Sequence, residues 1–157
     1  MPRIDLVERA PVAIFALWGP EYVVVLVNRL ACALWGRLLP ELLGRPLLAA
    51  VPELRGQAFE TLLAAELTSG AAAEGTELPV VVGRAGQAQT RYWTCRVTSR
   101  RDSPTGVTEI GVVAVDVTDQ WEARRQSTAP VEADARRRQE VHEALQTGAA
   151  LLAAAAP

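Results

Sequence analysis

Few side chains in this chain of 157 residues have the types and spacing that acid–base, nucleophilic or metal chemistry requires. The single histidine, His142, has no candidate nucleophile near it in the sequence, and Cys32 and Cys95 lack the spacing of a metal site. The sequence also has no glycine-rich loop of the phosphate-binding kind. Asp116 and Asp119 form a carboxylate pair, but they stand at a predicted helix start, where capping and the helix dipole explain them. We therefore predict that the chain is not an enzyme.

The most informative stretch is VVAVDVTDQWEARR, residues 112–125, in which a buried-looking strand runs directly into a charged helix. Thr118 has the chemistry of a helix N-cap, because its hydroxyl can accept a hydrogen bond from a free amide of the first turn. Asp116 lies on the same strand face as Ala114 and Val112, so its carboxylate is expected at the rim of the core or paired with an arginine. We interpret this stretch as a rigid joint through which a change in the sheet would move the helix.

The elements before the joint follow from hydrophobic period and turn residues. Residues 11–17 and 22–27 are β-branched runs around a Gly-Pro turn and predict a hairpin. Asn28 is a suitable N-cap for a helix over 29–35, which Gly36 ends, and residues 40–44 predict one more short helix. Residues 46–54 predict a loop or another short turn.

A longer helix and three strands follow. Phe59, Leu62, Leu63 and Leu67 form one apolar stripe on a helix that ends at Gly70. Residues 76–82 predict a strand whose Pro79 favours a sheet edge or a bulge. Residues 91–99 alternate as a second strand, and residues 107–117 form the last. The resulting order, β-β-α-α-α-β-β-β, predicts an α+β domain with an antiparallel sheet and helices packed on one face.

The segment from Asp119 onwards is more polar. Residues 119–126 predict a helix, residues 127–130 interrupt it at Pro130, and residues 131–146 resume it. The alanine-rich segment 147–157 includes Gly148 and could fray. Ala135, Val141 and Leu145 make a thin apolar stripe, which gives little support for an extended coiled coil.

Charge and hydropathy argue against nucleic-acid binding and against a membrane-spanning helix. The net charge of −2 favours neither nucleic acid nor an anionic membrane, and no apolar run has the roughly 18 residues of a membrane helix. We predict a cytoplasmic protein with no nucleic-acid or membrane partner, in which two distant cysteines stay reduced.

The order of these segments resembles the PAS domain family. Asp116-Val117-Thr118 is similar to the Asp-x-Thr motif that ends the PAS core, LVNRLACALWG to the strand, Asn and short helix near its start, and PELLGRPL to the segment that follows. The resemblance covers roughly residues 6–126. It implies a five-stranded antiparallel sheet cupping an apolar cavity, with short helices and one longer helix on one face. We divide the chain into a PAS-like sensory domain, residues 6–118, and a C-terminal signalling helix with an alanine-rich tail, residues 119–157.

Cofactor-binding branches of the family fit this sequence poorly, and we expect no cofactor. Flavin photoreceptors carry a reactive cysteine at the place where this chain has Leu47, which cannot form the adduct. Haem-binding members use a core histidine, whereas His142 lies outside the core, and Cys32 or Cys95 is more simply explained as packing. The segment around His142 faintly resembles a kinase phosphoacceptor helix, but a solvated helix histidine is the simpler interpretation.

The resemblance implies two sets of functional residues. The first would line the ligand pocket, although the same residues could simply fill a core: Leu47, Leu63, Trp93, Cys95, Ile110, Val112 and Ala114. The second would relay the signal: Asp116, Thr118, Gln120 and Trp121. We predict a sensory or regulatory input module of bacterial signal transduction that binds a small apolar ligand or relays a conformational change. A homodimer is expected, with a kinase of a two-component system, a phosphatase or a regulator as output partner. The alternative is a ligand-free dimerisation or interaction module.

Overall fold

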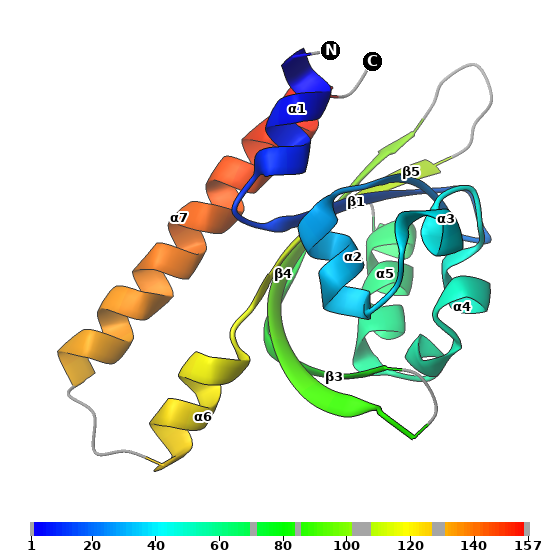
Figure 1. Ribbon diagram of the computed structural model, residues 1–157. Coiled ribbons are helices and arrows are strands. Elements are labelled where there is room, and N and C mark those ends of the chain that lie inside the picture. The colour runs from blue at the N-terminus through cyan, green and yellow to red at the C-terminus, as the bar shows by residue number, and fades with distance from the viewer. Residues whose placement is uncertain (1, 70–71, 84–85, 102–107, 127–130, 156–157) are drawn as a thin grey trace.

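A five-stranded antiparallel sheet organises the protein (Figure 1). The computed structural model describes residues 2–69, 72–83, 86–101, 108–126 and 131–155. The strands are β1 (Ala13–Trp18), β2 (Val23–Val27), β3 (Ala73–Val82), β4 (Gln89–Arg101) and β5 (Thr108–Asp116), in the spatial order β2-β1-β5-β4-β3. The first and last strands of the chain therefore pair at the centre of the sheet, and β3, which holds Pro79, lies at an edge as predicted.

The helices form two groups. Between β2 and β3 lie α2 (Arg29–Trp35), α3 (Leu39–Leu42), α4 (Leu47–Ala50), the short 3-10 helix η1 (Pro52–Leu54) and α5 (Ala58–Ser69). The chain also has α1 (Pro2–Arg9) before the sheet and α6 (Thr118–Gln126) and α7 (Val131–Ala155) after it. The predicted α+β fold class is confirmed. The predicted helix interruption at residues 127–130 lies outside the described residues.

Asn28 shows why the first helix after the hairpin begins where it does. Its buried side-chain oxygen accepts hydrogen bonds from the backbone N–H of Ala31, 3.0 Å away, and of Ile14, also 3.0 Å away. Its amide nitrogen donates to the carbonyls of Val7 and Val12, each at 2.9 Å. The predicted N-cap is confirmed, and the same side chain ties α1, β1 and α2 together.

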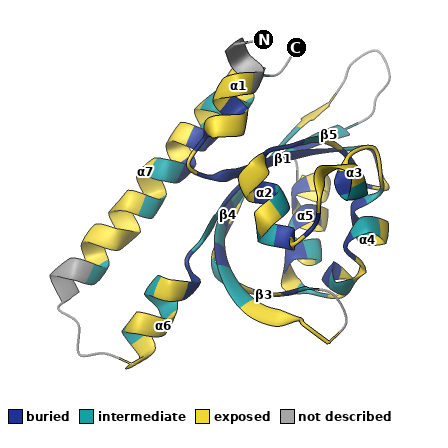
Figure 2. Ribbon diagram, viewed as in Figure 1, coloured by how far each residue is buried: buried dark blue, intermediate teal, exposed yellow. Residues whose placement is uncertain are grey.

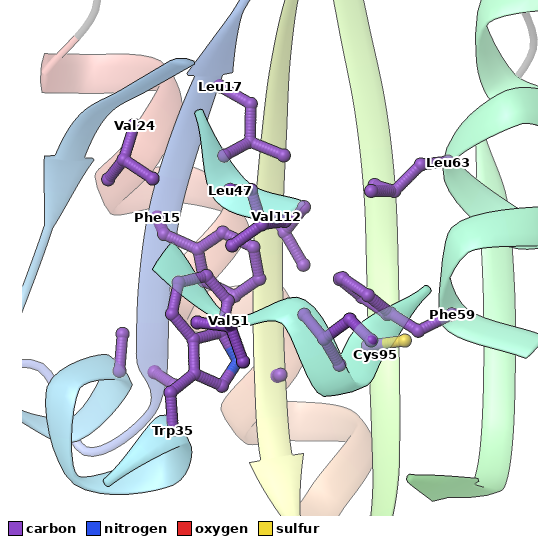
Figure 3. Close-up of a cluster of buried hydrophobic side chains, with 14 of the residues drawn as sticks. Phe15, Leu17, Val24, Trp35, Leu47, Val51, Phe59, Leu63, Cys95 and Val112 are labelled. Carbon is purple, nitrogen blue, oxygen red and sulfur yellow. The ribbon is translucent and has the colours of Figure 1, made fainter. Parts of the chain in front are cut away.

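The inner face of the sheet and helices α2 to α5 enclose the main core (Figure 3). Aromatic side chains run across it, with ring centroids 4.4 Å apart for Phe15 and Trp35 and 5.7 Å apart for Phe59 and Trp93. Edge-to-face packing of this kind stabilises a core beyond the burial of apolar area. The core therefore fixes α5 over β3 and β4.

One position of the α5 stripe differs from the prediction. Phe59 and Leu63 are fully buried, but Leu67 is 37% exposed, and Glu66 is buried in its place. The hydroxyl of Ser99 on β4 donates a hydrogen bond of 2.7 Å to the Glu66 carboxylate. A polar partner on the sheet therefore accommodates the charged residue that the apolar pattern would have placed outside.

The sequence did not predict the second helical layer. Helices α1 and α7 pack side by side on the outer face of the sheet, with both chain termini at the same end (Figure 1). Their apolar cluster includes Val7, Ile14, Val113 and Leu145. The expectation that the chain frays near Gly148 is wrong, because α7 continues to Ala155.

Candidate functional site

The junction between β5 and α6 is held by the side chain of Asp116. One carboxylate oxygen accepts a hydrogen bond of 2.9 Å from Arg91 Nε on β4, which forms an ion pair. The other accepts from the backbone N–H of Thr118 at 2.9 Å and from the Thr118 hydroxyl at 2.5 Å. Both oxygens are engaged, and pairing with an arginine was one of the two predicted placements.

Thr118 joins the start of α6 to β4 and does not cap the helix as predicted. Its buried hydroxyl oxygen accepts a hydrogen bond of 2.9 Å from the backbone N–H of Tyr92. The Tyr92 carbonyl accepts from the N–H of Val117 at 2.7 Å, and the Val117 carbonyl accepts from the N–H of Trp121 at 2.9 Å. The capping prediction is wrong because the pairing with β4 continues past the end of β5, first through the backbone of Val117 and then through the side chain of Thr118. The hydroxyl therefore bonds to the sheet.

Trp121 extends this junction along α6. Its ring stacks on Tyr92 with centroids 3.7 Å apart and an interplanar angle of 14°, and the Arg125 guanidinium lies 4.8 Å from the Trp121 ring centroid. Gln120 lies elsewhere, in the lining of a cavity between α6, α7 and the strands β3 and β4. Three of the four predicted relay residues thus meet at β4, and the fourth faces α7.

The charged groups at the junction stabilise the positive charge of Arg91. The hydrogen bond to Asp116 raises the pKa of Arg91 despite partial burial, and the charges of Asp116, Asp119 and Glu122 act in the same direction. Arg91 therefore keeps its positive charge at any physiological pH. Sequence reasoning missed Arg91 and Tyr92, because the partner strand of Asp116 is set by long-range pairing.

A second cluster lies beside the junction, in a cavity of about 180 Å³. Arg124 of α6 bonds to the carboxylate of Glu77 on β3 at 2.5 Å and lies 3.4 Å from the carboxylate of Asp134 on α7. The hydrogen bond from Arg124 to Glu77 raises the pKa of Arg124. None of these three residues was predicted from the sequence to be functional. One feature of the sequence could have drawn attention to Arg124, since it is a charged residue with charged neighbours on a predicted polar helix.

The seven residues of the predicted ligand pocket lie together in the main core. Each is at most 1% exposed, and they come from α4, α5, β4 and β5. Burial raises the pKa of the Cys95 thiol to about 11. Three cavities of about 620, 180 and 320 Å³ lie outside this core, and Ala114 alone of the seven residues lines one of them.

Three buried polar atoms of the core have no hydrogen-bond partner among the described residues. They are the indole nitrogens of Trp35 and Trp93 and the second carboxylate oxygen of Glu66. Buried polar atoms are usually paired, so each such atom calls for a water molecule or a ligand group. Trp93 was among the predicted pocket residues, whereas Trp35 and Glu66 were not.

Within the described residues, no group of three or more histidine, cysteine, aspartate or glutamate side chains is arranged to hold a metal ion. Across the same part of the chain, no helix has both the length and the apolar character needed to span a membrane.

Comparisons with known proteins agree with this architecture. The PAS fold family matches residues 7–122. A comparison with curated protein sequences found no match. Similar solved structures include an RNA-binding light-oxygen-voltage receptor, at 19% identity and a TM-score of 0.60, over 78% of this chain and 34% of that chain. The chain thus spans about a third of that receptor.

Two further structures match most of their own length. The PAS domain of nitrogen regulation protein NR(II) from Vibrio parahaemolyticus aligns at 14% identity and a TM-score of 0.55, over 74% of this chain and 97% of that chain. A LOV protein of Rhodobacter sphaeroides aligns at 16% identity and a TM-score of 0.55, over 98% of this chain and 94% of that chain. At these identities the likeness is one of fold.

Proposed function

This chain belongs to the PAS fold family, and we propose that it is a sensory or regulatory input module of bacterial signal transduction whose output is the position of α6 and α7. PAS domains are in general sensory modules without catalysis, and we propose no catalytic role here. In this proposal residues 6–118 sense and residues 119–157 transmit. The module acts in the cytoplasm, as a homodimer or on a kinase, phosphatase or regulator.

The observation that carries the proposal is the shared attachment of β5 and α6 to β4. Asp116 and Thr118 bond to each other and to Arg91 and Tyr92, all within 2.9 Å. A shift of β4 relative to β5 would therefore strain bonds that also fix the first turn of α6. The three hydrogen bonds that Asp116 accepts are charge-assisted, and such bonds are about twice as strong as neutral ones. We therefore expect the junction to transmit a displacement instead of absorbing it.

The output side is suited to movement. The exposed surface of α6 and α7 is large, and the described part of α7 before Val141 is mostly exposed (Figure 2). Leu145 and Gly148 are buried against the sheet further along. Segments with few buried contacts open at low free energy, which is a property that switching elements need. Because α7 is attached to the sheet mainly through this later part, its position can change when the junction between β5 and α6 moves.

A small molecule in the main core is the input we propose. The seven pocket residues would supply apolar contacts, and the unpaired indole N–H of Trp93 would donate to an acceptor atom. Such a ligand is apolar with at least one carbonyl or similar oxygen. Native mass spectrometry of purified protein tests this input. Extra mass that is lost on denaturation supports it, and bare protein that also fails to take up carbonyl-bearing apolar fragments contradicts it.

One observation favours the second candidate, a protein-interaction module. Leu38, Leu39 and Leu43 around α3 are 71%, 48% and 47% exposed. Neighbouring exposed leucines can mark an interaction surface. In that case Leu38→Ser with Leu43→Ser would abolish partner or dimer binding, whereas the junction variants described next would leave it unchanged.

The relay is tested by Asp116→Ala combined with Thr118→Ala. Hydrogen exchange of the full chain is compared with wild type, and near-ultraviolet circular dichroism reports whether the core stays folded. We expect faster exchange in α6 and α7 with a folded core. Unchanged protection of both helices in a folded double variant would contradict the relay.

A further inference from the structure

Strand β3 carries a backbone irregularity at the point where it meets the signalling helices. Gly75 pairs with Cys95 and Leu78 pairs with Trp93, so Thr76 and Glu77 together oppose the single residue Thr94. This is a β-bulge, which bends a strand and redirects a side chain. Glu77 takes the left-handed conformation, with φ of 51°, which is unusual for a residue other than glycine. Something beyond local preference must hold it there.

Two contacts hold the bulge. The N–H of Glu77 donates to the hydroxyl of Thr94 on β4 at 3.1 Å. The Glu77 carboxylate bonds to Arg124 of α6 at 2.5 Å, and the two side chains are 28% and 24% exposed. Backbone strain persists where the surroundings impose it, and such positions are common in switch regions. The conformation of β3 and the position of α6 are therefore linked.

Arg124 carries the link on to α7. Its Nε lies 3.4 Å from Asp134, which is 3.3 Å from Arg138 one turn later on the same helix. All four of these charged side chains line the cavity of about 180 Å³ between the sheet and the two helices. The chain of charges thus reaches from β3 through α6 to α7 without passing through Asp116 or Thr118.

The other side of β3 contacts the core. Gln57, just before α5, exchanges two hydrogen bonds with the backbone of Val81, at 2.8 and 2.7 Å. A Cβ on Gly75 would lie 3.3 Å from Leu62 of α5, which is closer than most side-chain contacts. A displacement of α5 would therefore reach β3 within two residues of the bulge.

We propose that the Glu77 bulge and Arg124 form a second relay, through which α5 and β3 control the docking of α6 and α7. The inference rests on the proposed function, because it assumes that the position of these helices is the output. Arg124 acts here as a positioning residue. The edge strand and the central junction are then two parallel inputs to one pair of helices.

The test uses the full chain and hydrogen exchange resolved by peptide. Glu77→Gln and Arg124→Gln each remove one charge of the pair, and Glu74→Gln is the matched control, since its nearest ion pair, with Arg96, spans 3.9 Å. We expect exchange over residues 134–145 to rise about threefold to tenfold in either variant, and less than twofold in the control. The double variant should not exceed Arg124→Gln, because that change alone removes the contacts of Arg124 with both Glu77 and Asp134.

Glu77→Gly separates the ion pair from the backbone conformation, since glycine accepts a positive φ without cost. We expect it to loosen α7 as Glu77→Gln does, while the β3–β4 pairing stays protected. Unchanged exchange of residues 134–145 in Glu77→Gln and Arg124→Gln, or an equal rise in Glu74→Gln, would overturn the second relay. If the Asp116 and Thr118 variants still loosen the helices in that case, the proposed function stands without it. If only the Glu77 and Arg124 variants loosen them, the second relay stands and the central junction fails.

Discussion

Gly148 of α7 lies so close to Val113 of β5 that no side chain fits between them. A Cβ on Gly148 would stand 2.6 Å from Val113 Cγ1 and 2.5 Å from Val12 Cγ2. Both neighbours are β-branched residues, Val113 on β5 and Val12 just before β1, and their side chains have little rotational freedom. This contact sets the distance at which α7 packs on the outer face of the sheet.

Gly148→Ala should therefore weaken the docking of α7, even though alanine favours a helix by about 1 kcal/mol. We expect overpacking to cost about 1–3 kcal/mol and exchange in α7 to rise accordingly. Gly111→Ala is the comparison, because its Cβ would meet the flexible end of Leu152 at 2.6 Å, which can rotate away. A milder effect of Gly148→Ala than of Gly111→Ala would contradict this account of the interface.

Thr118→Val tests the hydroxyl at the junction while keeping the shape of the side chain. It leaves the Tyr92 N–H without its acceptor, which should cost about 1–3 kcal/mol in unfolding free energy. Thr118→Ser keeps the hydroxyl and should stay within about 0.5 kcal/mol of wild type. Urea denaturation measures both. Equal stability of the valine and serine variants would show that the hydroxyl contributes nothing.

Glu53 predicts a specific pH dependence. Burial acts to raise its pKa, but hydrogen bonds from Arg37 and the Gly83 N–H outweigh burial, so the pKa lies below the usual 4.5. A lowered folded pKa means that the Arg37–Glu53 contact, 2.7 Å long, stabilises the fold above pH 4.5 and is lost as pH falls through the folded pKa. Denaturation curves should show Glu53→Gln less stable than wild type at pH 7, with the gap closing in acid. Parallel curves from pH 7 to pH 3 would refute this.

The two cysteines should differ in reactivity. Burial raises the pKa of Cys95 to about 11, so little thiolate forms at pH 8, and its side chain is inaccessible. Cys32 is partly exposed. Iodoacetamide should therefore modify Cys32 first in the folded protein and reach Cys95 only after denaturation, as peptide mass spectrometry would show. Equal rates for the two thiols in folded protein would contradict the packing of the core.

Local patterns predicted the five strands and the inner helices α2, α3 and α5, whereas α4 and η1 lie where residues 46–54 were predicted as a loop or a short turn. The β-branched runs of the hairpin, the alternation around Trp93 and the Asn28 cap each depend on residues within a few positions. The partners of Asp116 and Thr118 lie on β4, about 25 residues away, so strand pairing and not local preference decides them.

The docked position of α7 was not predictable from its hydrophobic pattern. Its contact with the outer face includes Val141 and Leu145, two residues of the predicted thin stripe. It also uses Gly148 and alanines such as Ala149, which add little to an apolar pattern but allow close approach. Glu66 escaped prediction for a related reason, since its partner Ser99 comes from another strand. The seven proposed pocket residues are buried together in the main core. The space they leave for a ligand depends on how tightly their side chains pack, which a sequence pattern does not give.

The most direct test of the central claim is to measure the distance between α7 and the sheet after the hydrogen bonds of the junction have been removed by substitution. Spin labels at Thr90 of β4 and Glu140 of α7, both exposed, report this distance by pulsed electron paramagnetic resonance in a Cys32→Ser background. We expect one narrow distance distribution in the otherwise native protein and a broad, longer one with Asp116→Ala and Thr118→Ala. An unchanged narrow distribution in the folded double variant would contradict the claim that the junction controls the signalling helices.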